Sequence, residues 1–95
     1  EGAVALRITG NSQFPRYAEG DTVIYGDPRS DHASLSQMVG RDVVVQLSCG
    51  KLLLKILKFS SVPGRWTLSS YNQPDLINQE IDWASRIQAI VPSKS

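Results

Sequence analysis

Lys55 is the residue of this 95-residue chain whose surroundings most favour chemistry. It lies in the middle of an apolar run, Leu52–Phe59, whose composition and length predict a β-strand. Successive side chains point to opposite faces of a strand, so Lys55 has apolar neighbours on both sides. Burial disfavours an ammonium group and lowers its pKa, and a neutral lysine can act as a general base. The alternative is a lysine that extends its ammonium group to water.

The other side chains that could do chemistry are isolated. His32 is the sole histidine and lies in a polar stretch, which indicates a solvated loop residue. Cys49 is the single cysteine, and no basic cluster surrounds it to activate the thiol. Aspartates at turns commonly bond the local backbone, which is our interpretation of Asp21, Asp27 and Asp42. One histidine and one cysteine are too few ligands for a typical metal site, so we expect no metal and no cofactor.

The elements that must position Lys55 are short, β-prone segments separated by turns. Val4, Leu6 and Ile8 alternate with other residues, as in a strand. Further strands are predicted at 22–25, 43–47, 52–59, 66–68 and 86–91. Turns are predicted at 19–21, 26–28, 48–51 and 62–64, and a loop at 72–75. The sequence therefore predicts a mostly-β fold of twisted antiparallel sheets and hairpins.

The sequence patterns of two further segments are less regular. Residues 28–39 are polar and predict an exposed loop or a short helix. The apolar segment 87–91 closes a short chain, and we expect it at a sheet edge, where an unprotected strand invites pairing with another chain.

Length and charge limit the class of protein. The chain is long enough for one domain, which we place at 1–95. Its formal net charge is +1 without a basic run, so an electrostatic footprint for nucleic acid is missing. No apolar run approaches the ~18 residues of a membrane span, and no signal peptide is visible. These features and the single cysteine suit a cytoplasmic protein. Because the chain starts at Glu1 rather than Met, we expect a fragment or processed product with a domain upstream.

A family resemblance begins around Ser12. The chain contains Gly10-Asn11-Ser12-Gln13-Phe14-Pro15, followed by Glu19-Gly20-Asp21-Thr22-Val23-Ile24-Tyr25. These segments resemble the nucleophile signature of the LexA, UmuD and phage-repressor family of self-cleaving proteins. That signature is Gly-x-Ser-Met-x-Pro, a short spacer, then Gly-Asp and an apolar strand.

Later segments extend the resemblance to nearly all of residues 4–91. Lys55 matches the family's catalytic lysine on the strand that follows a hairpin. The family's Gly-Asp strand start, its Leu-x-Ser-x-Asn strand and loop, and its closing strand are similar to Gly40–Val45, Trp66–Pro74 and Ile87–Val91. The order and spacing of these motifs carry the resemblance, rather than any single one.

The resemblance implies a LexA-like C-terminal domain that is a serine peptidase with a serine–lysine dyad. Lys55 takes the hydroxyl proton of Ser12, and Ser12 attacks a peptide carbonyl. Backbone N–H groups of Asn11 and Ser12 form the implied oxyanion hole. The bond attacked is the protein's own small-residue–Gly bond, in a segment upstream of the serine. The family's methionine after the serine is Gln13 here, which changes the local packing and leaves the activity open.

The function implied is that of the C-terminal domain of a phage-type transcriptional repressor. Such a domain dimerises and cleaves its own linker, which inactivates DNA binding by an N-terminal domain outside this chain. The family also implies a homodimer, and a RecA filament that stimulates cleavage in the SOS response. Two alternatives remain: a catalytically inactive oligomerisation domain, which Gln13 supports, and a UmuD-like DNA-polymerase accessory subunit. Signal peptidases share the dyad, but they need membrane-contacting apolar segments that the sequence lacks.

Overall fold

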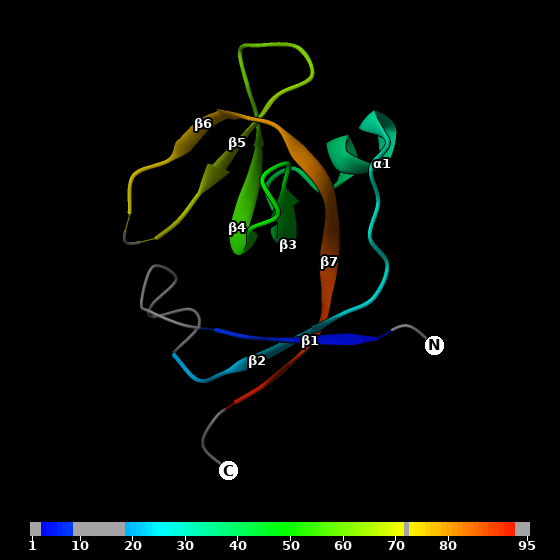
Figure 1. Ribbon diagram of the computed structural model, residues 1–95, viewed down its shortest axis with the longest axis vertical. Coiled ribbons are helices and arrows are strands. Elements are labelled where there is room, and N and C mark those ends of the chain that lie inside the picture. The colour runs from blue at the N-terminus through cyan, green and yellow to red at the C-terminus, as the bar shows by residue number, and fades with distance from the viewer. Residues whose placement is uncertain (1–2, 9–18, 72, 93–95) are drawn as a thin grey trace.

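The described strands form one antiparallel sheet, and the one helix among the described residues is short and lies beside it (Figure 1). The computed structural model describes residues 3–8, 19–71 and 73–92. Its elements are β1 Val4–Arg7, β2 Thr22–Tyr25, α1 His32–Gln37, β3 Asp42–Leu47, β4 Leu52–Phe59, β5 Trp66–Ser69, β6 Leu76–Gln79 and β7 Ile81–Val91. Their order in the sheet is β1-β2-β7-β3-β4-β5-β6. The predicted mostly-β fold of antiparallel strands and hairpins is confirmed.

The β3–β4 hairpin follows the local sequence closely. Strand β4 has the predicted bounds, and β3 begins one residue before the predicted start. The connecting turn contains Gly50 at a φ of 97°, a left-handed conformation that glycine adopts without a steric penalty. Its N–H donates to the carbonyl of Leu47 at 2.8 Å. The polar stretch 28–39 was expected to be an exposed loop or a short helix. It contains the helix α1, which has six residues.

The end of the chain differs from the sequence prediction. Strand β6 was not predicted, and β7 begins at Ile81 rather than at Arg86. Ala84 and Ser85 have weak strand preference, yet both are fully buried in β7. The Ser85 hydroxyl donates to the carbonyl of Arg86 at 3.0 Å and accepts from the Asp27 N–H at 3.4 Å. Tertiary burial therefore extends the strand through residues whose propensity gives no such signal.

Strand β7 joins the two halves of the sheet. Residues 81–86 pair with β3 on one edge, and residues 87–91 pair with β2 on the other. The long strand bends between these pairings, so that β1 and β2 cross the direction of β3 and β4 (Figure 1). The expectation that the last strand lies at a sheet edge is therefore wrong for the strand order, in which β7 is an inner strand. Its last residues nevertheless extend beyond β3 and pair only with β2 among the described strands.

Two apolar clusters cover opposite faces of the β3–β4 hairpin. On one face, β2 contributes Val23 and Tyr25, which pack with Val44 and Leu54 of the hairpin. On the other face, α1 and β5 cover a larger cluster that comprises Leu35, Met38, Val43, Val45, Leu47, Leu57, Trp66, Leu68 and Ala84. The hairpin is thus the buried centre of the molecule. Across the described residues, helical structure is limited to α1, whose length falls far short of a membrane span.

Candidate functional site

Lys55 lies in the centre of β4 and is almost completely buried. Only 6% of its surface is exposed, and both strands that flank β4, namely β3 and β5, are apolar. It pairs with Val43 across the β3–β4 ladder, so the two side chains lie on the same face of the sheet as Leu57. That face carries the larger apolar cluster. The sequence-based expectation of a buried lysine is therefore met, and the alternative of a lysine that extends to water is not.

The amine of Lys55 has a specific partner within this apolar surrounding. Lys55 Nζ donates a hydrogen bond of 2.5 Å to Ser70 Oγ, on the residue that follows β5. Burial lowers the pKa of the Lys55 ammonium below its usual value, because the low dielectric of the interior disfavours the charge. A lysine in this state is a better proton acceptor near neutral pH than an exposed one.

The predicted nucleophile, Ser12, lies outside the described residues, and so do Asn11, predicted for the oxyanion hole, and Gln13. Among the described residues, the hydroxyl that contacts the amine of Lys55 is that of Ser70. The structure therefore describes Lys55 alone of the two residues predicted as the dyad, with Ser70 as its hydrogen-bond partner.

The other two reactive side chains, His32 and Cys49, lie in exposed positions and form no described contact with Lys55. His32 is exposed at the start of α1, where its Nδ1 lies 3.3 Å from Ser36 Oγ and its ring lies 5.3 Å from that of Trp66. Cys49 is exposed in the β3–β4 turn. A search of the described residues for three or more clustered metal-ligating side chains finds none.

One of the three turn aspartates, Asp27, makes a different side-chain contact from the one predicted. Asp27 forms an ion pair with Arg29 at 3.1 Å, rather than a bond to the local backbone. The local backbone bond expected of a turn aspartate is made by Asp31, which caps α1 by accepting from the Ser34 N–H at 2.9 Å. Asp42 lies at the first position of β3 and contributes to a surface cavity.

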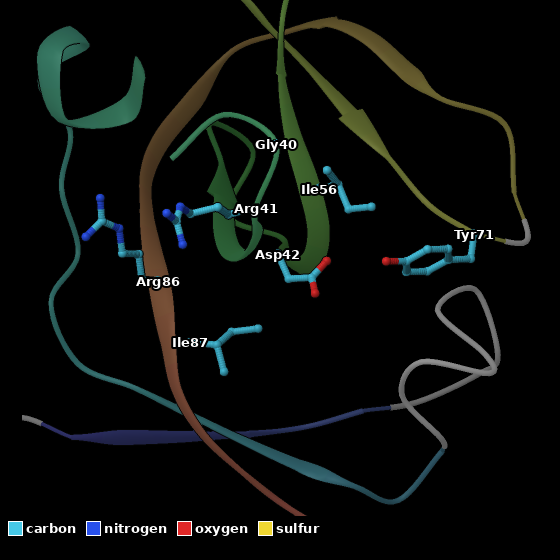
Figure 2. A pocket seen from close by; sticks show the side chains of 7 residues that line it. All are labelled: Gly40, Arg41, Asp42, Ile56, Tyr71, Arg86 and Ile87. Carbon is cyan, nitrogen blue, oxygen red and sulfur yellow. The ribbon is translucent and has the colours of Figure 1, made fainter. Parts of the chain in front are cut away.

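That cavity has a volume of about 390 Å³. Figure 2 shows its side chains, which come from the start of β3, the middle of β4, the segment after β5 and the middle of β7. Its lining is Gly40, Arg41, Asp42, Ile56, Tyr71, Arg86 and Ile87. Because Lys55 and Ile56 are adjacent on a regular strand, their side chains point to opposite faces. The cavity and the amine of Lys55 therefore lie on opposite sides of β4.

Sequence reasoning missed Ser70 as the partner of Lys55, although the hairpin register contained the signal. Strands β4 and β5 are antiparallel and flank the predicted turn at 62–64, and Leu57 pairs with Leu68. Continuing this register by two residues on each strand places position 55 opposite position 70. The cavity had no comparable signal, because its residues come from four separate segments.

Scans of the chain against protein-family models, curated proteins and solved structures find no match.

Proposed function

We propose that this chain is a self-cleaving serine peptidase domain of the phage-repressor type, with Ser12 as the nucleophile and Lys55 as the general base. The observation that supports this most directly is the setting of Lys55, which is 6% exposed, hydrogen-bonded to a hydroxyl and depressed in pKa. A lysine that serves only to solubilise a protein gains nothing from such a position, because burial of a charge is costly.

In the proposed mechanism the neutral amine of Lys55 accepts the hydroxyl proton of Ser12. The Ser12 oxygen then adds to the carbonyl carbon of a small-residue–Gly bond upstream in the same protein. Backbone N–H groups of Asn11 and Ser12 stabilise the oxyanion. When the peptide C–N bond breaks, the Lys55 ammonium returns its proton to the leaving amine, and water hydrolyses the acyl-serine. Ser70, by accepting a hydrogen bond from Nζ, restricts the direction in which the amine points.

The proposed biological role is that of a repressor's C-terminal domain, which forms a homodimer and whose cleavage is stimulated by a RecA filament. Cleavage would separate the domain from a DNA-binding domain upstream. The resemblance of the motifs supports this role. A UmuD-like polymerase subunit remains the alternative within the same family, and a helix-turn-helix upstream of Glu1 would distinguish the repressor from it.

A second candidate function is supported by the same hydrogen bond. If Lys55 is fully satisfied by Ser70, the pair can be a structural contact in a catalytically inactive oligomerisation domain. The substitution of Gln13 for the family's methionine is consistent with this alternative.

Cleavage in cis separates the two candidates. The test uses the chain joined to an upstream segment that contains an Ala–Gly bond, with cleavage followed by mass spectrometry from neutral to alkaline pH and with activated RecA filaments. We expect cleavage to accelerate as pH rises, because more of Lys55 becomes neutral. Ser12→Ala, Lys55→Ala and Lys55→Arg should each abolish it, since arginine stays protonated. Lys58→Ala, an exposed lysine on the same strand, is the matched control and should cleave normally.

The rate of cleavage in Ser70→Ala tests whether Ser70 positions the amine of Lys55. If Ser70 positions the amine, the variant should cleave more slowly but show the same dependence on Ser12. A protein that stays intact at about pH 10 with activated RecA present supports the inactive oligomerisation domain. Cleavage that persists in Ser12→Ala contradicts the assignment of the nucleophile.

A further inference from the structure

A cavity of about 240 Å³ lies between α1, the segment that leads into α1 and β7. Its lining is Asp27, Arg29, Ser34, Gln37, Met38 and Arg86. None of these residues belongs to the dyad or the oxyanion hole of the proposed peptidase, so the cavity has no role in that reaction. Its volume is below the roughly 300–1,000 Å³ of sites for drug-sized ligands. The cavity therefore has room for a ligand of a few heavy atoms.

Hydrogen bonds hold the backbone around this cavity in place. The N–H of Arg29 donates to the carbonyl of Ala84 on β7 at 2.8 Å, and the N–H of Ala84 donates to the carbonyl of Arg29 at 2.9 Å. Two residues earlier, the N–H of Asp27 donates to Ser85 Oγ at 3.4 Å. The side chain of Asp31 caps the start of α1. Walls that are fixed before a ligand enters lower the entropy cost of binding it.

Arg86 supplies a cation on the β7 side of the cavity. It pairs with Val43 in the β3–β7 ladder, so its side chain leaves the sheet on the face that α1 covers. Figure 2 shows its guanidinium group across β7 from Arg41 and Asp42. The residue is exposed, so a ligand that enters from solvent can reach it.

Arg29 supplies a second cation, which is already oriented. Its Nη2 donates to the carboxylate of Asp27 at 3.1 Å, and Arg86 takes no part in this ion pair. A guanidinium group has five N–H donors, so the ion pair uses only some of those on Arg29. The side-chain amide of Gln37 can donate as well. Two guanidinium groups against one carboxylate leave the lining with an excess of one positive charge and of hydrogen-bond donors.

We propose that this cavity binds the carboxylate of a small organic acid. Arg29 and Arg86 hold the carboxylate oxygens, Gln37 donates from its amide, and Met38 contacts the alkyl group. The planar guanidinium group matches the geometry of a carboxylate. A single excess positive charge matches a monoanion, whereas the carboxylate of Asp27 would repel the second charge of a phosphate dianion. The carboxylate could come from a free acid or from the C-terminus of a peptide, and the experiment distinguishes the two sources.

The experiment titrates the folded chain with propionate at constant ionic strength and follows the amide signals of Arg29, Gln37 and Arg86 by ¹H–¹⁵N NMR. Propionamide has nearly the same shape without the charge. Because hydrogen bonds to charged groups are the stronger ones, we expect it to bind at least about tenfold more weakly. Equal affinity for the two compounds would overturn the proposal. N-acetyl-alanine that binds more tightly than propionate assigns the site to a peptide C-terminus, and the reverse order assigns it to a free acid.

Variants of the exposed arginines test the assignment without disturbing the core. Arg86→Gln and Arg29→Gln should each weaken the binding of propionate by about tenfold. Arg7→Gln removes the same charge from an exposed position on β1, outside the cavity, and should bind normally. The melting temperature of each variant verifies that it is folded. Unchanged affinity in both cavity variants, or inorganic phosphate that binds as tightly as propionate, would refute the carboxylate site.

Discussion

The sequence predicts that Lys55 lies within a strand, and the fold buries its side chain. Its amine is surrounded by apolar strands and donates to one hydroxyl, that of Ser70. The folded protein therefore binds a proton on Lys55 less tightly than the unfolded chain, since burial depresses the pKa. Between the depressed folded pKa and the unfolded value of about 10.4, the unfolded state holds more protons. The contribution of Lys55 to stability consequently rises with pH through this window and is lost as pH falls through the folded pKa.

Replacement of Lys55 by methionine should remove this dependence. We expect the free energy of unfolding of the wild-type protein to rise relative to that of Lys55→Met as pH increases toward about 10.4. Urea denaturation at a series of alkaline pH values measures the difference, and subtraction cancels groups common to both proteins. Lys58→Met, at an exposed position on the same strand, is the control. A difference between wild type and Lys55→Met that stays constant with pH contradicts a depressed pKa.

At the scale of the elements, the β4–β5 pairing contributes strongly to the core. Leu57 and Leu68 are opposite one another in the ladder, and both are fully buried. Leu57→Ala should lower the free energy of unfolding by about 2–5 kcal/mol, because it removes buried methyl groups and leaves a cavity. Leu52→Ala, at a position 39% exposed on the same strand, should change it by only about 0.5 kcal/mol. Chemical denaturation measures the free energy of unfolding of both variants. Similar losses of stability in the two would contradict the assignment of Leu57 to the buried face of β4.

The short helix α1 depends on its first capping residue. Asp31 accepts from the backbone N–H of Ser34, and this hydrogen bond lowers the pKa of its carboxyl below the usual aspartate value. Since the folded pKa is depressed, the stabilisation is present above the unfolded pKa of about 3.9 and is lost as pH falls through the folded pKa. The helix has only six residues, so it has little internal stability to compensate for the loss of its cap.

Asp31→Ala should therefore lower the melting temperature near neutral pH, and the difference from wild type should shrink in acid. Asp31→Asn keeps an oxygen that can accept from Ser34 and has no charge to titrate, so its effect should be small and independent of pH. Thermal melts at about pH 7 and well below about pH 3.9 give the comparison. An alanine variant that is equally destabilised at both pH values would argue against the capping role.

At the scale of the whole molecule, β7 connects two groups of strands. The C-terminal part of β7 pairs on only one edge with a described strand. Its residues 87–91 extend past β3, and Ile90 and Val91 are 41% and 52% exposed. Val4 on the neighbouring edge strand β1 is 46% exposed. A strand edge that no described strand pairs with, next to exposed apolar side chains, invites pairing with another chain. We therefore propose that the interface of the homodimer proposed above lies at this end of β7.

Val91→Glu should weaken this dimer by at least about tenfold, because a charge would be buried in the interface. Sedimentation over a range of protein concentrations measures the dissociation constant. Ile77→Glu introduces the same charge at a residue 63% exposed on β6, the opposite edge of the sheet, and should leave the dimer intact. A wild-type protein that stays monomeric at high micromolar concentration contradicts the dimer, and dissociation by Ile77→Glu alone would move the interface to β6.

The sequence by itself determined the local features of the protein. The alternation at Val4, Leu6 and Ile8, the apolar run 52–59 and the glycine turn at Gly50 predicted strands and hairpins that the structure contains. The same run predicted a buried Lys55. These features depend on residues close together in the chain, where side-chain alternation and turn geometry restrict the backbone to few conformations.

The tertiary structure decided which distant segments meet. It inserts β7 between β2 and β3, extends that strand through Ala84 and Ser85, and brings Arg29 and Arg86 to one cavity. It also assembles the 390 Å³ cavity from four separate segments of the chain. No local pattern specifies these choices, because the free energy of pairing two distant strands depends on the apolar surface that the whole sheet buries.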